Sequence, residues 1–365
     1  MLIKKIKVAL GIIAGRVFTG PIEVSLDLTR NCSVGCIMCW YWSPLLKNPP
    51  SQEWLNKQID YNIFLQLVKD FKRLQVKRVI LGGQGEPLLY PKIFEVIETL
   101  KKNGFEVSLI TAGVHLNDYK TKNLFELGVD HIDFSLQTAA PITYLKIHPN
   151  QKEGTLERIK SQIQLLSELK KKFNRKTPKI QIINVICNLN YQDTVKIVEL
   201  AKEVGAESIG IKRIDVIPET RELLLNNSQL DELKDLFKDA KEKAKQFGIE
   251  TSMDFYQEFI LQGLTTGVYT STYYSQIPCY VGWVTSRILS DGNVVPCCGC
   301  YDVILGNINH NSFKEIWYSQ RYQNFRRESI NLNKSDLMGR GCKCYSCIDF
   351  EFNLGIYHKL HPFGT

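Results

Sequence analysis

The distribution of cysteine constrains this chain more than any other feature of its sequence. Of its 11 cysteines, Cys32, Cys36 and Cys39 form a C-x3-C-x2-C cluster, and seven more fall between residues 279 and 347. Disulfide-rich secreted chains are usually much shorter, and the apolar segment Val8–Ile13 is too short for the core of a signal peptide. We therefore expect a cytoplasmic protein whose clustered, reduced thiols bind metal.

The first half of the chain alternates short apolar segments, rich in valine and isoleucine, with helical patterns. The expected strands are Glu23–Leu28, Arg78–Leu81, Glu106–Thr111, His131–Leu136, Lys179–Val185 and Ser208–Lys212. The expected helices include Tyr61–Leu74, Lys92–Asn103, Leu156–Lys172 and Asp193–Val204. Six strand–helix repeats predict an α/β fold with a parallel sheet, either open or a partial (β/α)6 barrel. In both, chemistry belongs at the carboxyl ends of the strands.

Composition divides the chain into three predicted parts. Residues 1–215 would form the α/β core, the polar and mostly helical residues 216–275 a bridge, and the Cys-, Gly- and Trp-rich residues 276–365 a small metal-stabilised domain. The net charge of +8 does not indicate one class of binding partner. Nucleic acid is not expected as a partner, because no basic run is interleaved with aromatic residues. No segment approaches the roughly 20 apolar residues that a membrane span needs.

The first cysteine cluster follows the first expected strand, where a site should lie. Three thiolates can hold three irons of a [4Fe–4S] cube and leave the fourth iron without a protein ligand, which is the open position that a catalytic metal site needs. A zinc knuckle that lacks one ligand, or three incidental buried cysteines, are the alternatives. The spacing of Cys32, Cys36 and Cys39, with Met38 before and Trp40 after the last cysteine, resembles the radical SAM superfamily.

This resemblance implies a cofactor set and a reaction. The open iron would bind S-adenosylmethionine (SAM), an electron donor such as flavodoxin or ferredoxin would reduce the cluster, and SAM would be cleaved to a 5′-deoxyadenosyl radical that abstracts a hydrogen atom from substrate. Within the segment Gly82–Leu89, the residues Gly83, Gly85 and Glu86 resemble the family's glycine-rich segment and would hold the SAM amino group. Ser135 would touch the SAM ribose, and Trp40 would pack against SAM or the cluster.

The C-terminal cysteines point to a second metal site. Cys279 and Cys297 flank an expected hairpin whose turn contains Asp291 and Gly292, and Cys344 and Cys347 form a C-x2-C chelate. A hairpin brings its two base positions together, so these four thiolates can close around one zinc ion or one cubane.

The same stretch resembles SPASM or twitch domains, which bind auxiliary iron–sulfur clusters. The resemblance implies one auxiliary [4Fe–4S] cluster on Cys279, Cys297, Cys344 and Cys347. A structural zinc ribbon is the alternative. The remaining three cysteines are spare, and any of them could replace one of the four: Cys298, Cys300 and, before the others, Cys342.

Three functions remain open at this point. We expect a radical SAM enzyme that oxidises or rearranges a small metabolite such as a sugar, alcohol or lipid head group. We favour this function because only 31 residues precede Cys32, which leave no room for the leader-binding domain that many peptide maturases carry. A SPASM-type maturase of a peptide or protein side chain is the second hypothesis, and a zinc-stabilised binding protein is the third. The sequence does not identify the substrate, the bond attacked, the fate of SAM or the oligomeric state.

Overall fold

The computed structural model describes residues 2–254, 261, 263–267, 277–347 and 350–361. Parts of the predicted bridge (216–275) and of the predicted C-terminal domain (276–365) therefore lie outside the described residues. Among the residues described, no helix combines the length and the apolar character that crossing a membrane requires.

A single mixed sheet runs through the described chain. Its strand order is β10-β9-β8-β1-β2-β3-β4-β5-β6-β7, and all neighbours from β8 to β7 are parallel. The strands are β1 Glu23–Leu26, β2 Arg78–Leu81, β3 Glu106–Thr111, β4 His131–Ser135, β5 Lys179–Ile186, β6 Ser208–Arg213, β7 Glu250–Thr251, β8 Thr285–Ile288, β9 Asn293–Val295 and β10 Gly306–Asn307.

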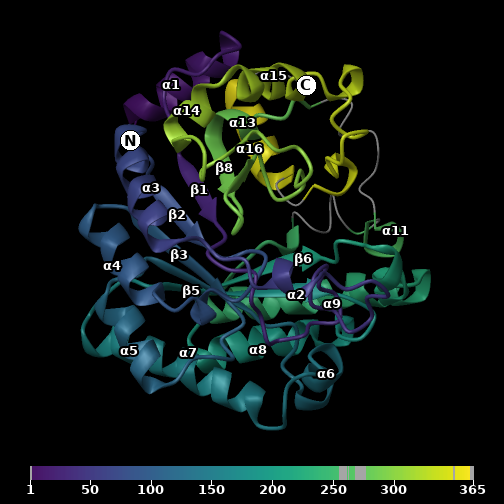
Figure 1. Cartoon of the computed structure of the whole chain (residues 1–365). Coiled ribbons are helices and arrows are strands. Elements are labelled where there is room, and N and C mark those ends of the chain that lie inside the picture. The colour runs from purple at the N-terminus through teal and green to yellow at the C-terminus, as the bar shows by residue number, and fades with distance from the viewer. Residues whose placement is uncertain (1, 255–260, 262, 268–276, 348–349, 362–365) are drawn as a thin grey trace.

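Helices connect successive parallel strands, and Figure 1 shows α4, α5, α7 and α8 along the outer side of the sheet. The α-helices are α1 Leu2–Ile13, α2 Gln52–Leu55, α3 Tyr61–Arg73, α4 Ile93–Lys102, α5 Asp118–Glu126, α6 Pro141–Ile147, α7 Thr155–Lys172, α8 Thr194–Val204, α9 Asn227–Phe247, α11 Gly263–Thr266, α13 Val281–Val284, α14 Phe313–Tyr318, α15 Gln320–Ser329 and α16 Phe350–Leu360. Short 3-10 turns cover Pro87–Leu89 (η1), Tyr191–Asp193 (η2), Pro218–Leu223 (η3), Leu332–Lys334 (η4) and Cys344–Ser346 (η5).

The predicted α/β fold is confirmed, and helix α3 illustrates why the sequence was informative. Its N-cap Asp60 accepts hydrogen bonds from the backbone N–H groups of Asn62 and Ile63, and its apolar residues recur at helical spacing. Phe64 and Phe71 are fully buried against the sheet. Such signals are local, so the pattern places the first six strands to within two residues.

The C-terminal hairpin does not stand apart from the core. Strand β8 pairs in parallel with β1, from Glu23 opposite Thr285 to Leu26 opposite Ile288, and β9 returns antiparallel to β8 as predicted. Gly292 occupies the turn with a φ of 85°. The central sheet therefore crosses the predicted boundary at residue 276, and the division into three parts stays a prediction.

Helix α1 packs beside the C-terminal elements. Val8 and Ile12 contact a cluster that contains Tyr280, Trp283 and Val284 of the α13 region. Figure 1 shows α1 near α14, at the end of β1 opposite its arrowhead. This places α1 at the amino ends of the parallel strands, away from the end where the cysteine loop begins.

Candidate functional site

The three cysteines of the first cluster lie in one irregular loop after β1. The N–H of Cys39 donates to the carbonyl of Cys36 at 3.0 Å, which curls the chain into a turn between these thiols. The N–H groups of Tyr41 and Trp42 donate to Cys39 Sγ at 3.5 and 3.4 Å. Such N–H···S bonds favour a thiolate, which is the form that binds iron.

Burial works against ionisation of the same thiols. It raises the pKa of Cys32 to about 12 and that of Cys36 well above its usual value, and the proximity of Cys39 adds to both shifts. A set of buried thiols with raised pKa values loses its protons to a bound cation, because coordination deprotonates a thiol outright. The donor set of this loop therefore fits a metal cluster on Cys32, Cys36 and Cys39.

The glycine-rich segment after β2 lies directly against the cysteine loop. The N–H of Glu86 donates to the carbonyl of Asn31 at 2.9 Å. A Cβ on Gly85 would lie 2.6 Å from the backbone carbonyl oxygens of Thr29 and Asn31, closer than any side-chain carbon can approach. Gly85 thus permits close contact between the cysteine loop and the glycine-rich segment, the two segments that the resemblance predicts to bind the cluster and SAM.

The Glu86 carboxylate is almost fully buried and holds the loops after β2 and β3 together. Oε1 accepts from the Thr111 hydroxyl at 2.7 Å and from the Leu88 N–H at 3.1 Å, and Oε2 accepts from the Ala112 N–H at 2.9 Å. Burial raises the pKa of Glu86, and these three donors oppose that shift. The structure thus gives Glu86 an organising role at the strand ends, and its predicted contact with the SAM amino group stays a prediction.

The remaining predicted SAM contacts lie on other strand ends. Ser135 ends β4, is half-buried, and accepts a hydrogen bond from Gln137 Nε2 at 2.7 Å. Gln137 Oε1 in turn accepts from the Val185 N–H of β5 at 2.8 Å. Ser135 therefore stands at the same edge of the sheet as the cysteine loop, held by the next strand.

Trp40 connects the cysteine loop to the C-terminal part of the chain. Its indole N–H donates to the carbonyl of Asp215, just after β6, at 3.0 Å. Its ring makes an edge contact with Tyr301 at 5.6 Å between centroids, and Lys343 Nζ lies 4.1 Å from its centre. The observed partners of Trp40 are thus protein groups from three regions, and its predicted packing against SAM stays a prediction.

A buried ion pair that the sequence did not reveal lies beside the glycine-rich segment. The Arg287 guanidinium of β8 donates to Asp27 Oδ2 at 3.0 and 3.1 Å, and Asp27 follows β1. A Cβ on Gly83 would overlap both side chains, so the close approach of this segment requires glycine. Although desolvation acts to lower it, the Asp27 carboxylate raises the pKa of Arg287.

Arg30 links three loops that the sequence treated separately. Its Nε donates to Gln84 Oε1 in the glycine-rich segment at 3.1 Å, and its terminal nitrogen donates to Asp291 Oδ2 of the C-terminal hairpin turn at 2.7 Å. Its guanidinium also stacks 3.7 Å above the Trp54 ring. Arg30 and Asp291 are both visible in the sequence beside the predicted motifs, but nothing in the sequence indicates that they contact each other.

The four predicted auxiliary ligands gather around one cavity. Cys279, Cys297, Cys344 and Cys347 line it together with Cys300, Lys343 and apolar side chains such as Phe325. Burial raises the pKa of Cys344 to about 11. Thiols gathered around one apolar cavity fit a cysteine-ligated cubane, and Cys279, Cys297, Cys344 and Cys347 stay its predicted ligands.

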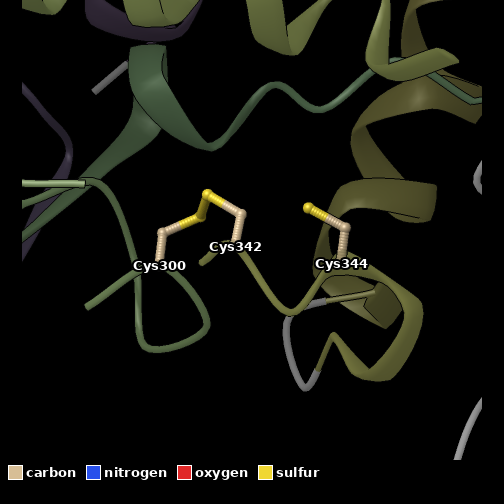
Figure 2. Close-up of side chains that lie close together, drawn as sticks. All are labelled: Cys300, Cys342 and Cys344. Atoms are coloured by element: carbon tan, nitrogen blue, oxygen red, sulfur yellow. A yellow bond between two sulfur atoms is a disulfide. The ribbon is translucent and has the colours of Figure 1, made fainter. Parts of the chain in front are cut away.

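Two of the spare cysteines pair with each other. Figure 2 shows Cys300 and Cys342 joined by a disulfide, with the Cys344 sulfur pointing toward them. We expected reduced thiols throughout, so this pairing is a difference from the prediction. The sulfurs of Cys300, Cys342 and Cys344 all lie within 4.8 Å of one another and form a second possible metal-binding group. Cys344 belongs both to this group and to the predicted four-cysteine ligand set. The two sets differ in the other cysteines that would share the metal with it.

Two protein-family profiles match the chain, and each matched region contains one of the two cysteine clusters. The radical SAM superfamily profile matches residues 26–201, which contain the first cysteine cluster and the glycine-rich segment. The profile of the SPASM iron–sulfur cluster-binding domain matches residues 279–348, which span all seven C-terminal cysteines.

Individual relatives are distant but extend over most of the chain. The tungsten-containing aldehyde ferredoxin oxidoreductase cofactor-modifying protein of Pyrococcus furiosus is 25% identical over 315 residues, covering 82% of this chain and 82% of that protein. The PqqA peptide cyclase of Ruegeria pomeroyi is 23% identical over 342 residues, covering 89% and 83% respectively. Among solved structures, Streptococcus suis SuiB bound to S-adenosylmethionine aligns with a TM-score of 0.63 at 15% identity, covering 84% of this chain and 68% of that one, and so shares the fold.

The geometry and the profile matches agree on the cofactors. The cysteine loop and the C-terminal cysteine cavity each suit a [4Fe–4S] cluster, and SAM binding belongs to the first domain. The chain therefore contains a radical SAM domain and, at its C-terminus, a SPASM iron–sulfur domain.

Proposed function

We propose that this enzyme modifies a side chain of a peptide or protein, as a SPASM-type maturase. The observation that supports this most is the similarity to a PqqA peptide cyclase, which extends over 342 residues and covers 89% of this chain. This similarity favours a peptide or protein substrate over the small metabolite that we expected from the sequence. The length of the segment before Cys32 does not decide between them, because it does not show how a substrate reaches the strand ends.

The proposed site depends on loops whose positions the protein fixes before substrate binds. The chemistry that a cluster on Cys32, Cys36 and Cys39 supplies with bound SAM is one-electron cleavage of the sulfonium and abstraction of a hydrogen atom from substrate. The chain's own residues fix the loops around this cluster. Glu86 connects the strand ends, and Arg30 connects the cysteine loop to the C-terminal hairpin. Fixed geometry matters because a reactive radical attacks whichever hydrogen lies nearest.

The two cysteine sites are linked through aromatic and cationic contacts. Trp40 follows the last cysteine of the first cluster and touches Tyr301, which follows Cys300 in the second cysteine region. Lys343, one residue before Cys344, lies over the same indole. A substrate radical formed near Trp40 would thus lie close to the auxiliary domain, which suits a net oxidation in which the auxiliary cluster takes one electron. The oxidoreductase character and the electron donor, such as flavodoxin or ferredoxin, belong to this proposal.

Anaerobic turnover tests the proposal. Reconstituted, reduced enzyme is incubated with SAM and short peptides encoded beside its gene, and 5′-deoxyadenosine is measured together with the peptide mass. We expect 5′-deoxyadenosine to form with one peptide, and that peptide to change mass. The Cys36→Ala variant is the control and should form neither product. Deuterium transfer from a labelled peptide into 5′-deoxyadenosine would name the carbon attacked.

A small metabolite is the second candidate, because the relative from Pyrococcus furiosus is named for modifying a cofactor. Under this alternative, peptides would leave 5′-deoxyadenosine formation at its background rate, and a sugar, alcohol or cofactor precursor would raise it with transfer of substrate deuterium. That result would overturn the maturase proposal and leave the radical SAM assignment intact.

A further inference from the structure

Helix α1 has one face packed against the protein. Val8, Gly11 and Ile12 are buried on this face, and Gly11 lets the helix lie close to Trp283. Lys4 is buried beside them, and its ammonium group donates to the carbonyls of Pro21 at 2.7 Å, Leu74 at 3.0 Å and Gln75. These contacts fix the rotation of the helix about its own axis, so its other face cannot turn inward.

The opposite face of α1 carries a continuous apolar stripe. Its members are between 49% and 76% exposed: Leu2, Ile3, Ile6, Leu10 and Ile13. Residues spaced by three and four positions lie one above another on a helix, so these side chains form one surface. Single exposed apolar residues are normal in soluble proteins, but a contiguous row of large ones marks a binding surface.

Positive charge borders this stripe. At about 100° per residue, Lys5 and Lys7 fall on its two sides, and both are exposed. Arg16 lies over the ring of Phe18, 4.9 Å from its centre, and Phe18 is also exposed. Residues 1–22 contain four basic side chains and no acidic one. An apolar stripe edged by cations matches the surface of an anionic bilayer, where acyl chains lie beneath negative head groups.

We propose that α1 binds the surface of anionic lipid membranes, lying in the interface with its stripe inserted and its lysines at the head groups. An apolar protein surface or a second copy of the chain would match the stripe but gives no reason for cations along both of its edges. The site is separate from the chemistry. Lys4 binds Pro21, which precedes β1, whereas the cysteine loop follows β1 at the other end of the strand. Membrane binding would leave the catalytic end facing the solvent.

Vesicle sedimentation with the full-length protein tests the proposal. We expect the wild type to bind vesicles of phosphatidylcholine and phosphatidylglycerol more tightly than vesicles of phosphatidylcholine alone, and to lose this preference at high salt. The variant Ile6→Glu/Leu10→Glu places two charges in the stripe and should weaken binding at least about tenfold. The variant Lys5→Glu/Lys7→Glu should lose the preference for the anionic lipid.

Controls separate the stripe from general effects. Ile142→Glu changes an isoleucine on α6 that is even more exposed than Ile6 and Leu10, and should leave binding unchanged. Because none of the substituted side chains packs in the core, circular dichroism and Tm should match the wild type in every variant. Failure of the wild type to bind anionic vesicles, or equal binding to neutral ones, would overturn the proposal. A wild-type dimer that Ile6→Glu/Leu10→Glu converts to a monomer, without vesicle binding, would assign the stripe to a second copy instead.

Discussion

Asp27 and Arg287 form a buried ion pair between two neighbouring strands that are far apart in the sequence. Asp27 follows β1 in the radical SAM domain, and Arg287 lies on β8, which runs parallel to β1. Both side chains are buried, with Asp27 1% and Arg287 9% exposed. The pair therefore joins the radical SAM domain to the cysteine-rich part of the chain, beside Gly83 of the glycine-rich segment.

Arg287→Met should lower the free energy of unfolding by about 3–5 kcal/mol, because it leaves the Asp27 carboxylate buried without its partner. Chemical denaturation of the variant and the wild type measures the difference. The double variant Asp27→Asn/Arg287→Met removes both charges and should recover part of the loss. Equal destabilisation of the single and double variants would contradict the ion-pair explanation.

The sequence predicted what depends on local pattern. Apolar runs placed β1 to β6, and the spacing of Cys32, Cys36 and Cys39 predicted the first cluster site. The pairing of β8 with β1 was not predicted, because it depends on side chains brought together only by the completed fold. Arg30 and Asp291 were missed for the same reason, since an isolated charge carries no sign of its partner.

Alanine at Gly85 should separate the two loops that are predicted to form the SAM site. The added Cβ would meet backbone atoms at 2.6 Å, and backbone cannot move aside as a flexible side chain can. We expect a loss of about 1–3 kcal/mol in stability and weaker SAM binding. Calorimetric titration with SAM measures the second effect, and iron analysis shows whether the first cluster is retained.

Gly355→Ala is the matched control. Gly355 lies within α16, and among the described residues no atom beyond its own stretch of helix lies within 4 Å of an added Cβ. Alanine should be neutral there or stabilise the helix by about 0.5–1 kcal/mol. If Gly355→Ala and Gly85→Ala had the same effect on SAM affinity, contact between the loops would not be the cause.

The C-terminal ligand set can be tested one cysteine at a time. Alanine at Cys279, Cys297, Cys344 or Cys347 should reduce the iron content of the anaerobically reconstituted protein from about eight to about four atoms per chain, because each change removes a predicted ligand of the auxiliary cluster. Iron and sulfide analysis measures this loss.

Cys300→Ala and Cys342→Ala supply the comparison. If these two cysteines pair with each other, both variants should keep the full iron content. A loss of iron in either variant would replace the proposed set with one that includes the neighbours of Cys344. Zinc in place of iron would contradict the assignment of an auxiliary iron–sulfur cluster.

Lys4 should make the stability of the protein depend on pH. Burial, and secondarily the charge of Lys77, lowers the pKa of Lys4 from 10.5 to about 7 in the folded state. Between these two values the unfolded chain binds more protons than the folded chain, so raising the pH favours folding. The free energy of unfolding of the wild type relative to Lys4→Met should therefore increase as the pH rises from about 7 toward 10.5, and fall to its lowest value below pH 7. Denaturation curves of both proteins across this range measure the difference, in which other titrating groups cancel. A difference that stays constant with pH would show that the ammonium remains charged among its three carbonyl partners, and that burial does not displace its proton.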